Sequence, residues 1–145
     1  MRSTSNMTAM IRAIIALTSA LSTTALFAQS PTVSLKGHDP VSYFTEGRPV
    51  KGQTTINYDY DDARYRFSSP RNRELFAASP ERYTPQFSGL CTTGMALGVK
   101  AEADPSVFKI VDGKLYVFSS TGAREKVDKD PSLLAKAQQN SRSVR

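Results

Sequence analysis

Five prolines each follow a residue that can cap a helix, and these pairs predict where most of the helices begin. They are Asp39-Pro40, Ser69-Pro70, Ser79-Pro80, Asp104-Pro105 and Asp130-Pro131. In each pair the side-chain oxygen can accept a hydrogen bond from a free amide of the first helical turn, where the missing N–H of proline is not needed. The pairs predict helices within residues 39–47, 69–78, 79–87 and 130–140, and a single turn leading into a strand at 104–108.

Two segments alternate apolar and polar residues with the period of two that is typical of β-strands. In residues 54–69, a turn at Asp61-Asp62 would place Tyr60 opposite Ala63, Tyr58 opposite Tyr65 and Ile56 opposite Phe67. In residues 107–120, the Asp112-Gly113 pair is a strong hairpin signal. This second turn would put one apolar set on a common face, namely Phe108, Ile110, Leu115 and Val117.

Hairpins combined with short helices predict the α+β class. We expect a single small domain in which two β-hairpins pack against several short helices and a C-terminal helix. We expect no repeat, no low-complexity segment and no linker. The tail at 141–145 is expected to fray.

The first 28 residues have the pattern of an export signal. Arg2 and Arg12 are followed by an uncharged apolar run, residues 13–28, that is short for a membrane span. We expect cleavage after Ala28, with Ala25 as the alternative site and an uncleaved membrane anchor as the other interpretation. The predicted location is the periplasm or the exterior of the cell, with the membrane contacted only through this segment if it is not cut.

The charge pattern argues against nucleic acid as a partner. The chain has 19 Lys and Arg against 13 Asp and Glu, but the basic residues are dispersed. The densest group comprises Arg64, Arg66, Arg71 and Arg73. A nucleic-acid footprint needs a concentrated basic stripe, so a solvated face is expected here, and a protein partner stays unidentified.

Cys91 is the only cysteine of the chain, in the stretch QFSGLCTTGMALG. In an exported protein such a residue is a buried inert thiol, a free reactive thiol, a metal ligand or a bridge to another chain. If residues 90–97 are helical, Cys91 and Met95 share a face. Together with His38 they would form a soft ligand set for copper(I). In the alternative interpretation Cys91 and Met95 only fill the core.

A small-ligand pocket is the second possibility for this region. It would lie between the aromatic hairpin and the Cys91 segment, lined by Tyr43, Phe67, Phe87 and Cys91. Catalysis is not expected. Asp39 is better explained as a helix cap than as a member of a triad, and a thiol enzyme would need His38 as its base.

Three blocks of sequence resemble the YHS-domain family of small exported proteins. They are GHDPVSYFTEGRPVKG, YRFSSPRNRELFAASPERYTPQFSGLC and FKIVDGKLYVF, within a YHS-like domain at 36–140 that follows a short extension at 29–35. The resemblance implies a small α+β domain and a metal- or redox-associated module. Metal-associated members carry three cysteines where this chain has Ser42, Ser68 and Asn72, so their thiolate site is not transferred.

Three functions therefore follow from the sequence. The first is a non-catalytic exported module that binds a transition metal or a small ligand near Cys91. The second is a redox protein that acts through the Cys91 thiol. The third is an accessory protein that acts through a protein interface.

Overall fold

The computed structural model describes residues 30–143, so the predicted signal peptide at 1–28 lies outside the described residues. The α+β class is confirmed: one three-stranded and one two-stranded sheet are accompanied by short helices. No helix within 30–143 has the length and apolar character needed to cross a membrane.

The first half of the described chain builds the three-stranded sheet, with strand order β1-β3-β2. Strand β1 runs parallel to β3, and β2 and β3 form an antiparallel hairpin. The elements of this half are β1 (Thr32–Val33), the 3-10 turn η1 (Ser34–Gly37), α1 (Ser42–Thr45), β2 (Gln53–Tyr60), β3 (Ala63–Phe67), α2 (Pro70–Ala78) and α3 (Pro80–Tyr83).

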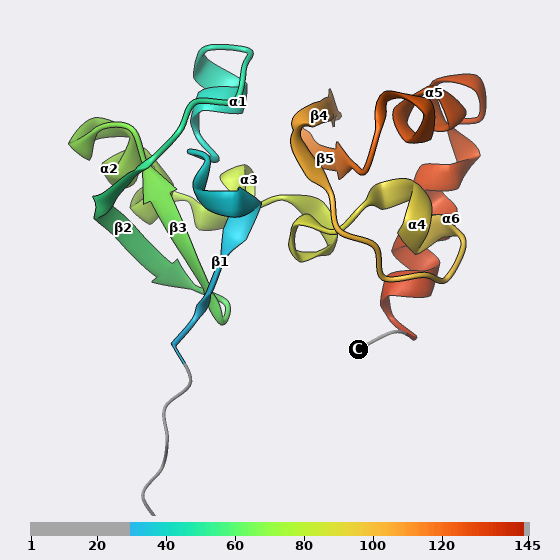
Figure 1. Cartoon of the computed structure of the whole chain (residues 1–145), viewed down its shortest axis with the longest axis horizontal. Helices are drawn as coiled ribbons and strands as arrows, with labels where there is room; N and C mark the ends of the chain where they lie inside the picture. The colour runs from blue at the N-terminus through green and yellow to red at the C-terminus, as the bar shows by residue number, and fades with distance from the viewer. Residues whose placement is uncertain (1–29, 144–145) are drawn as a thin grey trace, which may run out of the picture.

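The second half follows the same order around the antiparallel pair β4-β5. Its elements are the 3-10 turn η2 (Gln86–Gly89), α4 (Thr92–Ala96), β4 (Asp104–Val111), β5 (Lys114–Phe118), α5 (Thr121–Lys129) and α6 (Ser132–Ser141). Figure 1 shows the two halves next to each other, the first in blue to green and the second in yellow to red.

The two halves are structural repeats, and the expectation that the chain has no repeat is wrong. The first hairpin and the helix after it recur 51 positions later in the chain. Strand β2, for example, begins at Gln53, and its equivalent β4 begins at Asp104. Both hairpins also carry an irregularity at the same place, between Gln53 and Asn57 in one and between Asp104 and Phe108 in the other. Little sequence survives between the copies apart from Tyr-x-Phe-Ser-Ser, at 65–69 and 116–120, which explains why the repeat escapes a search for residue identity.

The turns that precede the helices α1 and α4 are repeated as well, at an offset of 52 positions. In η1, Leu35 and Lys36 have φ of 49° and are followed by Gly37 at 80°. In η2, Phe87 and Ser88 have φ of 55° and are followed by a glycine at the same 80°. Because non-glycine residues rarely adopt positive φ, a matching pair of such turns is strong support for the repeat.

Both hairpins pair largely as predicted. Tyr60 opposite Ala63 and Tyr58 opposite Tyr65 are confirmed, as is the common face of the second hairpin, where Phe108 pairs with Val117 and Ile110 with Leu115. Ile56 opposite Phe67 is wrong, because the irregularity in β2 makes Gln53 the partner of Phe67. A period of two in the sequence carries no sign of such a bulge.

Serine caps explain where α2 and α5 begin. The Ser69 side chain accepts from the amide of Asn72, with Pro70 at the first position of α2. The helix α5, which the proline pattern missed, begins in the same way with Ser120 accepting from the amide of Ala123. Each such cap stabilises a helix by about 1 kcal/mol.

Asp104-Pro105 is the one proline pair that starts no helix. Strand β4 begins there, and Asp104 accepts instead from the amide and hydroxyl of Ser106. The other four pairs lie at or just before α1, α2, α3 and α6.

Strand β1 and the start of η1 lie within the predicted extension at 29–35. Thr32 and Val33 already pair with Ala63 and Arg64 of β3. At the other end α6 continues to Ser141, one residue into the predicted tail at 141–145.

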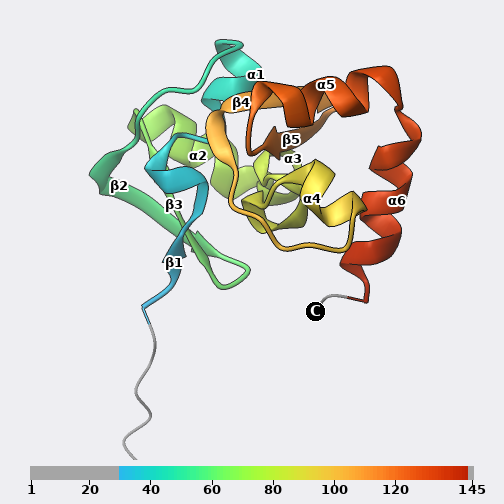
Figure 2. The ribbon, with the colours of Figure 1, turned by 45° about the vertical axis from the view of Figure 1, so that its right-hand side comes forward.

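A shared core joins the two repeats into one domain. Leu35 and Tyr43 of the first half pack with Leu115 and Val117 of the second. The Tyr43 hydroxyl also donates to the Pro105 carbonyl at 2.8 Å. Figure 2 shows α1 lying close to β4 at this junction.

Candidate functional site

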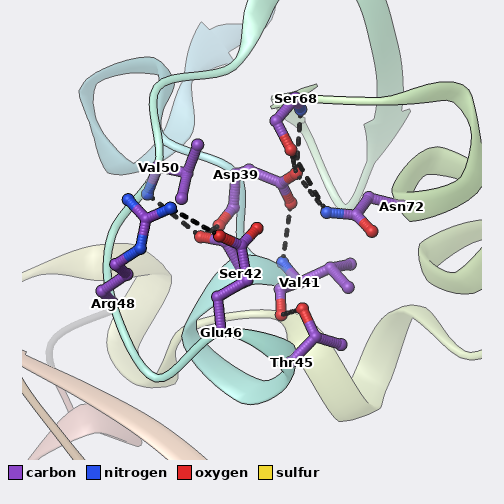
Figure 3. A network of polar contacts seen from close by, with 9 residues as sticks. All are labelled: Asp39, Val41, Ser42, Thr45, Glu46, Arg48, Val50, Ser68 and Asn72. Carbon is purple, nitrogen blue, oxygen red and sulfur yellow. Dashed lines mark hydrogen bonds and ion pairs between the residues drawn. The ribbon is translucent and has the colours of Figure 1, made fainter.

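Asp39 is the centre of a closed polar network in the first half (Figure 3). Its side chain is fully buried. One carboxylate oxygen accepts from the Ser68 amide, the Ser68 hydroxyl and the Asn72 side-chain amide at 2.7–2.8 Å. The other accepts from the amide of Val41 at 2.9 Å. These four donors leave the carboxylate with no need of an external ligand.

Ser42, Ser68 and Asn72, the positions at which the predicted YHS resemblance would put cysteines, meet at this network. Ser68 and Asn72 bind the Asp39 carboxylate, and the Ser42 hydroxyl donates to the Asp39 carbonyl at 2.8 Å. Ser42 also accepts from the amide of Val50. Their polar groups are thus engaged with one another, and they offer no soft ligand for a transition metal.

Cys91 takes the place of Asp39 in the second half. It lies at the position equivalent to Asp39, directly before the short helix α4, and its side chain is only 2 % exposed. The amide of Ser119, the residue equivalent to Ser68, donates to the sulfur at 3.2 Å. The Ser119 hydroxyl lies 3.4 Å from the same sulfur. A thiol donates to this hydroxyl, and a thiolate accepts from it.

The environment of Cys91 favours the thiolate. Burial alone would raise the pKa of the thiol, because it removes water from the charged form. The hydrogen bond from the Ser119 hydroxyl and the nearby amides of Gly94, Ser119 and Thr93 outweigh that effect and bring the pKa below its ordinary value. Gly94 and Thr93 act without making a full capping bond.

A hollow of about 420 Å³ lies beside the sulfur. Its wall from α5 is made of Gly122, Ala123 and Lys126, with Ser119 and Ser120 at the start of that helix. Ala123 is the equivalent of Asn72, so a methyl group stands where the first half has an amide that covers the carboxylate. The small side chains leave space next to Cys91, and Lys126 brings a positive charge to its border.

The predicted copper set is not gathered in one place. Met95 packs with Ala96 and Ala137 and lines a separate hollow of about 450 Å³. His38 belongs to the first half, where its Nδ1 lies 2.9 Å from the Leu35 carbonyl. Within residues 30–143, no three His, Cys, Asp or Glu side chains cluster as a metal site would need.

The predicted aromatic pocket is divided in the same way. Tyr43 packs in the core at the junction, and Phe67 packs in the aromatic cluster of the first half. Phe87 lines the hollow of Met95, whereas Cys91 lines its own. Of the four residues named for that pocket, Cys91 alone lines the hollow beside α5.

Ser119 is the residue of the candidate site that the sequence did not reveal. Its signal was available in the repeated Phe-Ser-Ser, since Phe118 and Ser119 copy Phe67 and Ser68. In each copy the serine after the second hairpin strand binds the side chain that precedes the short helix.

Comparison with known proteins gives no relative from which a role for this site could be inferred. No protein-family model, no curated protein and no solved structure matches the chain.

Proposed function

We propose that the protein is a non-catalytic binding module that holds a small, soft ligand through the sulfur of Cys91. The observation that carries this proposal is the pairing of a lowered thiol pKa with an adjoining hollow of about 420 Å³. A thiolate is the form of cysteine that binds soft metals and attacks electrophiles. Copper(I) is one of the soft metals that such a sulfur binds.

The surroundings of Cys91 support binding rather than turnover. A thiol enzyme needs a base placed beside its nucleophile. His38, the only histidine of the chain, is tied to the Leu35 carbonyl in the first half. The thiolate is instead stabilised by fixed donors from Ser119 and α4, which hold a charge without moving a proton.

Reversible oxidation of Cys91 is the second candidate, and the lowered pKa favours it as well. A low-pKa thiolate reacts with oxidants to give a sulfenic acid. Since the chain has no other cysteine, that product would be resolved by a thiol from another molecule. The proposal of a location in the periplasm or outside the cell rests on residues 1–28, and so does any membrane contact.

An anaerobic copper(I) competition titration tests the proposal. We expect one equivalent to bind to the protein and none to the Cys91→Ser variant. Met95→Leu is the matched control, and we expect it to retain binding, because Met95 lines a different hollow. Equal, weak binding by the protein and by Cys91→Ser would remove copper as the ligand.

Alkylation separates the two candidates. Fast reaction of the native protein with iodoacetamide, together with a stable sulfenic acid after peroxide, would favour the redox function. A thiol that reacts only after unfolding would end both functions and favour an accessory role.

A further inference from the structure

The hollow of about 450 Å³ that Met95 lines is formed by both repeats. Tyr65 of β3 contributes from the first repeat, and η2, α4 and α6 contribute from the second. Phe87, Leu90 and Met95 give the lining an apolar part. The volume is typical of pockets that hold small molecules. This hollow shares no lining residue with the one beside α5.

The α6 wall of this hollow belongs to the second repeat alone. Pro80 at the start of α3 and Pro131 just before α6 are equivalent in the two repeats. Helix α3 ends at Tyr83, whereas α6 continues to Ser141. Gln138 and Ser141, which line the hollow, lie in this additional length. The hollow is therefore not a by-product of packing that both repeats share.

Hydrogen bonds hold this wall in place. The Gln138 side chain donates to the Gln86 side-chain oxygen at 2.9 Å, which ties α6 to η2. The Asn140 side chain donates to the carbonyls of Met95 and Ala96 at 3.1 and 3.0 Å, which ties α6 to α4. Figure 2 shows α4 and α6 next to each other. A wall that is already fixed reduces the entropy lost when a ligand binds.

Gln86 and Gln138 present one free donor and one free acceptor at the hollow. Their mutual bond uses the oxygen of Gln86 and the nitrogen of Gln138. The nitrogen of Gln86 and the oxygen of Gln138 bond no residue between 30 and 143, and neither atom is sealed from solvent. Both side chains are half-buried and line the hollow.

Tyr65 adds a second donor. Its side chain is 4 % exposed and lines the hollow. Burial raises the pKa of Tyr65, and a hydrogen bond from the Ser34 hydroxyl opposes that effect. Because Ser34 is the donor in this bond, the hydrogen of the Tyr65 hydroxyl still needs an acceptor, and no residue within 30–143 provides one. A buried donor without an acceptor costs free energy, so this hydroxyl points to a ligand in the hollow.

The lining carries no net charge. Asp61 and Lys100 are the charged residues that line the hollow, one of each sign, and both are exposed. The groups that select a ligand are therefore the half-buried and buried polar ones, with two donors and one acceptor.

We propose that this hollow binds a small neutral carboxamide with an apolar body. The amide oxygen accepts from the Tyr65 hydroxyl and the Gln86 nitrogen. The amide N–H donates to the Gln138 oxygen, and the apolar body lies against Phe87. A carboxylate would leave the Gln138 oxygen without a donor, and an ammonium group would leave both donors without an acceptor, so the site rejects them. The site is independent of Cys91.

Four probes with the same indole body test this proposal: indole-3-acetamide, the anionic indole-3-acetate, the cationic tryptamine, and 3-methylindole, whose side chain has no polar group. The chain contains no tryptophan, so the indole fluorescence reports the probe alone. We expect indole-3-acetamide to bind most tightly and the other three at least roughly fivefold more weakly. Equal or tighter binding of any of the three would overturn the proposal.

Variants of the lining give the second arm. Tyr65→Phe removes the free hydroxyl and Gln138→Leu removes the free acceptor, and each should weaken indole-3-acetamide roughly threefold to tenfold. Neither should change the binding of 3-methylindole by more than about twofold. Tyr116→Phe is the matched control for the first variant, because Tyr116 is the equivalent of Tyr65 and packs in the cluster of Cys91. Gln139→Leu, at an exposed position of α6, is the control for the second. We expect both controls to bind as the unmodified protein does.

Three further results would overturn the proposal. The first is indole-3-acetamide binding that is indifferent to both Tyr65→Phe and Gln138→Leu. The second is no binding of indole-3-acetamide at millimolar concentration. The third is loss of binding in Cys91→Ser, which would place the probe in the hollow beside α5. The melting temperature of each variant, measured without probe, shows that the comparison is made between folded proteins.

Discussion

Asp39 and Cys91 occupy equivalent positions in the two repeats, yet the donors around them differ. Both side chains accept a hydrogen bond from the amide of a serine that follows a hairpin strand, Ser68 in one half and Ser119 in the other. In the first half, Asn72 completes the set of donors and closes the site. In the second half a methyl group stands at the equivalent position, and a hollow remains beside the sulfur.

The comparison shows how one framework can serve two purposes. A carboxylate with four donors is a structural element, since the donors would be left unpaired without it. The Cys91 sulfur has fewer and longer hydrogen bonds, so it can still bind a ligand. The difference depends on side chains of α2 and α5, whereas both sites share a hairpin and the serine that follows it.

Asp39→Ala should have the largest effect, because it leaves buried donors of Val41, Ser68 and Asn72 without an acceptor. We expect it to lower the free energy of unfolding by about 4 kcal/mol. Denaturant unfolding measures this, with the exposed Asp62→Asn as control at no more than about 0.5 kcal/mol. A loss below about 1 kcal/mol would show that the network is not a structural element.

Rebuilding the first site inside the second is a sharper test. Cys91→Asp alone should destabilise the protein, because Ser119 supplies too few donors for a carboxylate. Adding Ala123→Asn should recover about 1–3 kcal/mol of coupling energy in a double-mutant cycle. Gly122→Asn, one position away on α5, should give no such coupling. Additive effects of Cys91→Asp and Ala123→Asn would mean that the two sites are not equivalent.

Ser119→Ala tests what sets the reactivity of Cys91. The variant removes the hydroxyl that stabilises the thiolate but retains the Ser119 amide. We expect the pKa of Cys91 to rise and alkylation at neutral pH to slow roughly fivefold to tenfold. The pH dependence of the iodoacetamide rate measures both. Ser68→Ala, its equivalent in the first half, should not move the pKa of Cys91; a shift there would contradict the independence of the two sites.

The smallest effect is a dependence of stability on pH. Because the pKa of Cys91 is lower in the folded protein than in the unfolded chain, its thiolate stabilises the fold above the ordinary thiol pKa. This contribution is lost as the pH falls through the folded pKa. We expect the stability of the protein, relative to Cys91→Ser, to rise with pH across this window. A flat difference would show that Cys91 is not an ionising group.

The sequence predicted the parts of the fold that have local causes. Ser69-Pro70 and Asp112-Gly113 fix a helix start and a turn through neighbouring atoms only, and both were predicted. The helix α5 was missed because Thr121 stands where α2 has a proline, although Ser120 caps it equally well.

The candidate site could not be predicted in full, because it is formed by contacts between residues that are distant in the sequence. Cys91 was identified as a candidate, but its partner Ser119 lies 28 positions away and carries no distinctive chemistry. The soft-ligand chemistry of Cys91, Met95 and His38 says nothing of their placement: Cys91, which precedes α4, and Met95, on α4, line different hollows. The burial of each side chain, and the hollow that it lines, are set by how whole helices and strands pack.

The bond between Tyr43 and Pro105 has a consequence for how the protein folds. It joins residues 62 positions apart, whereas each hairpin closes over two residues. Closing a long loop loses more chain entropy than closing a short one, so contacts across the junction should form after those within each repeat. We therefore expect Tyr43→Phe to speed unfolding with little change in the refolding rate. The junction would be the last region to assemble and the first to open.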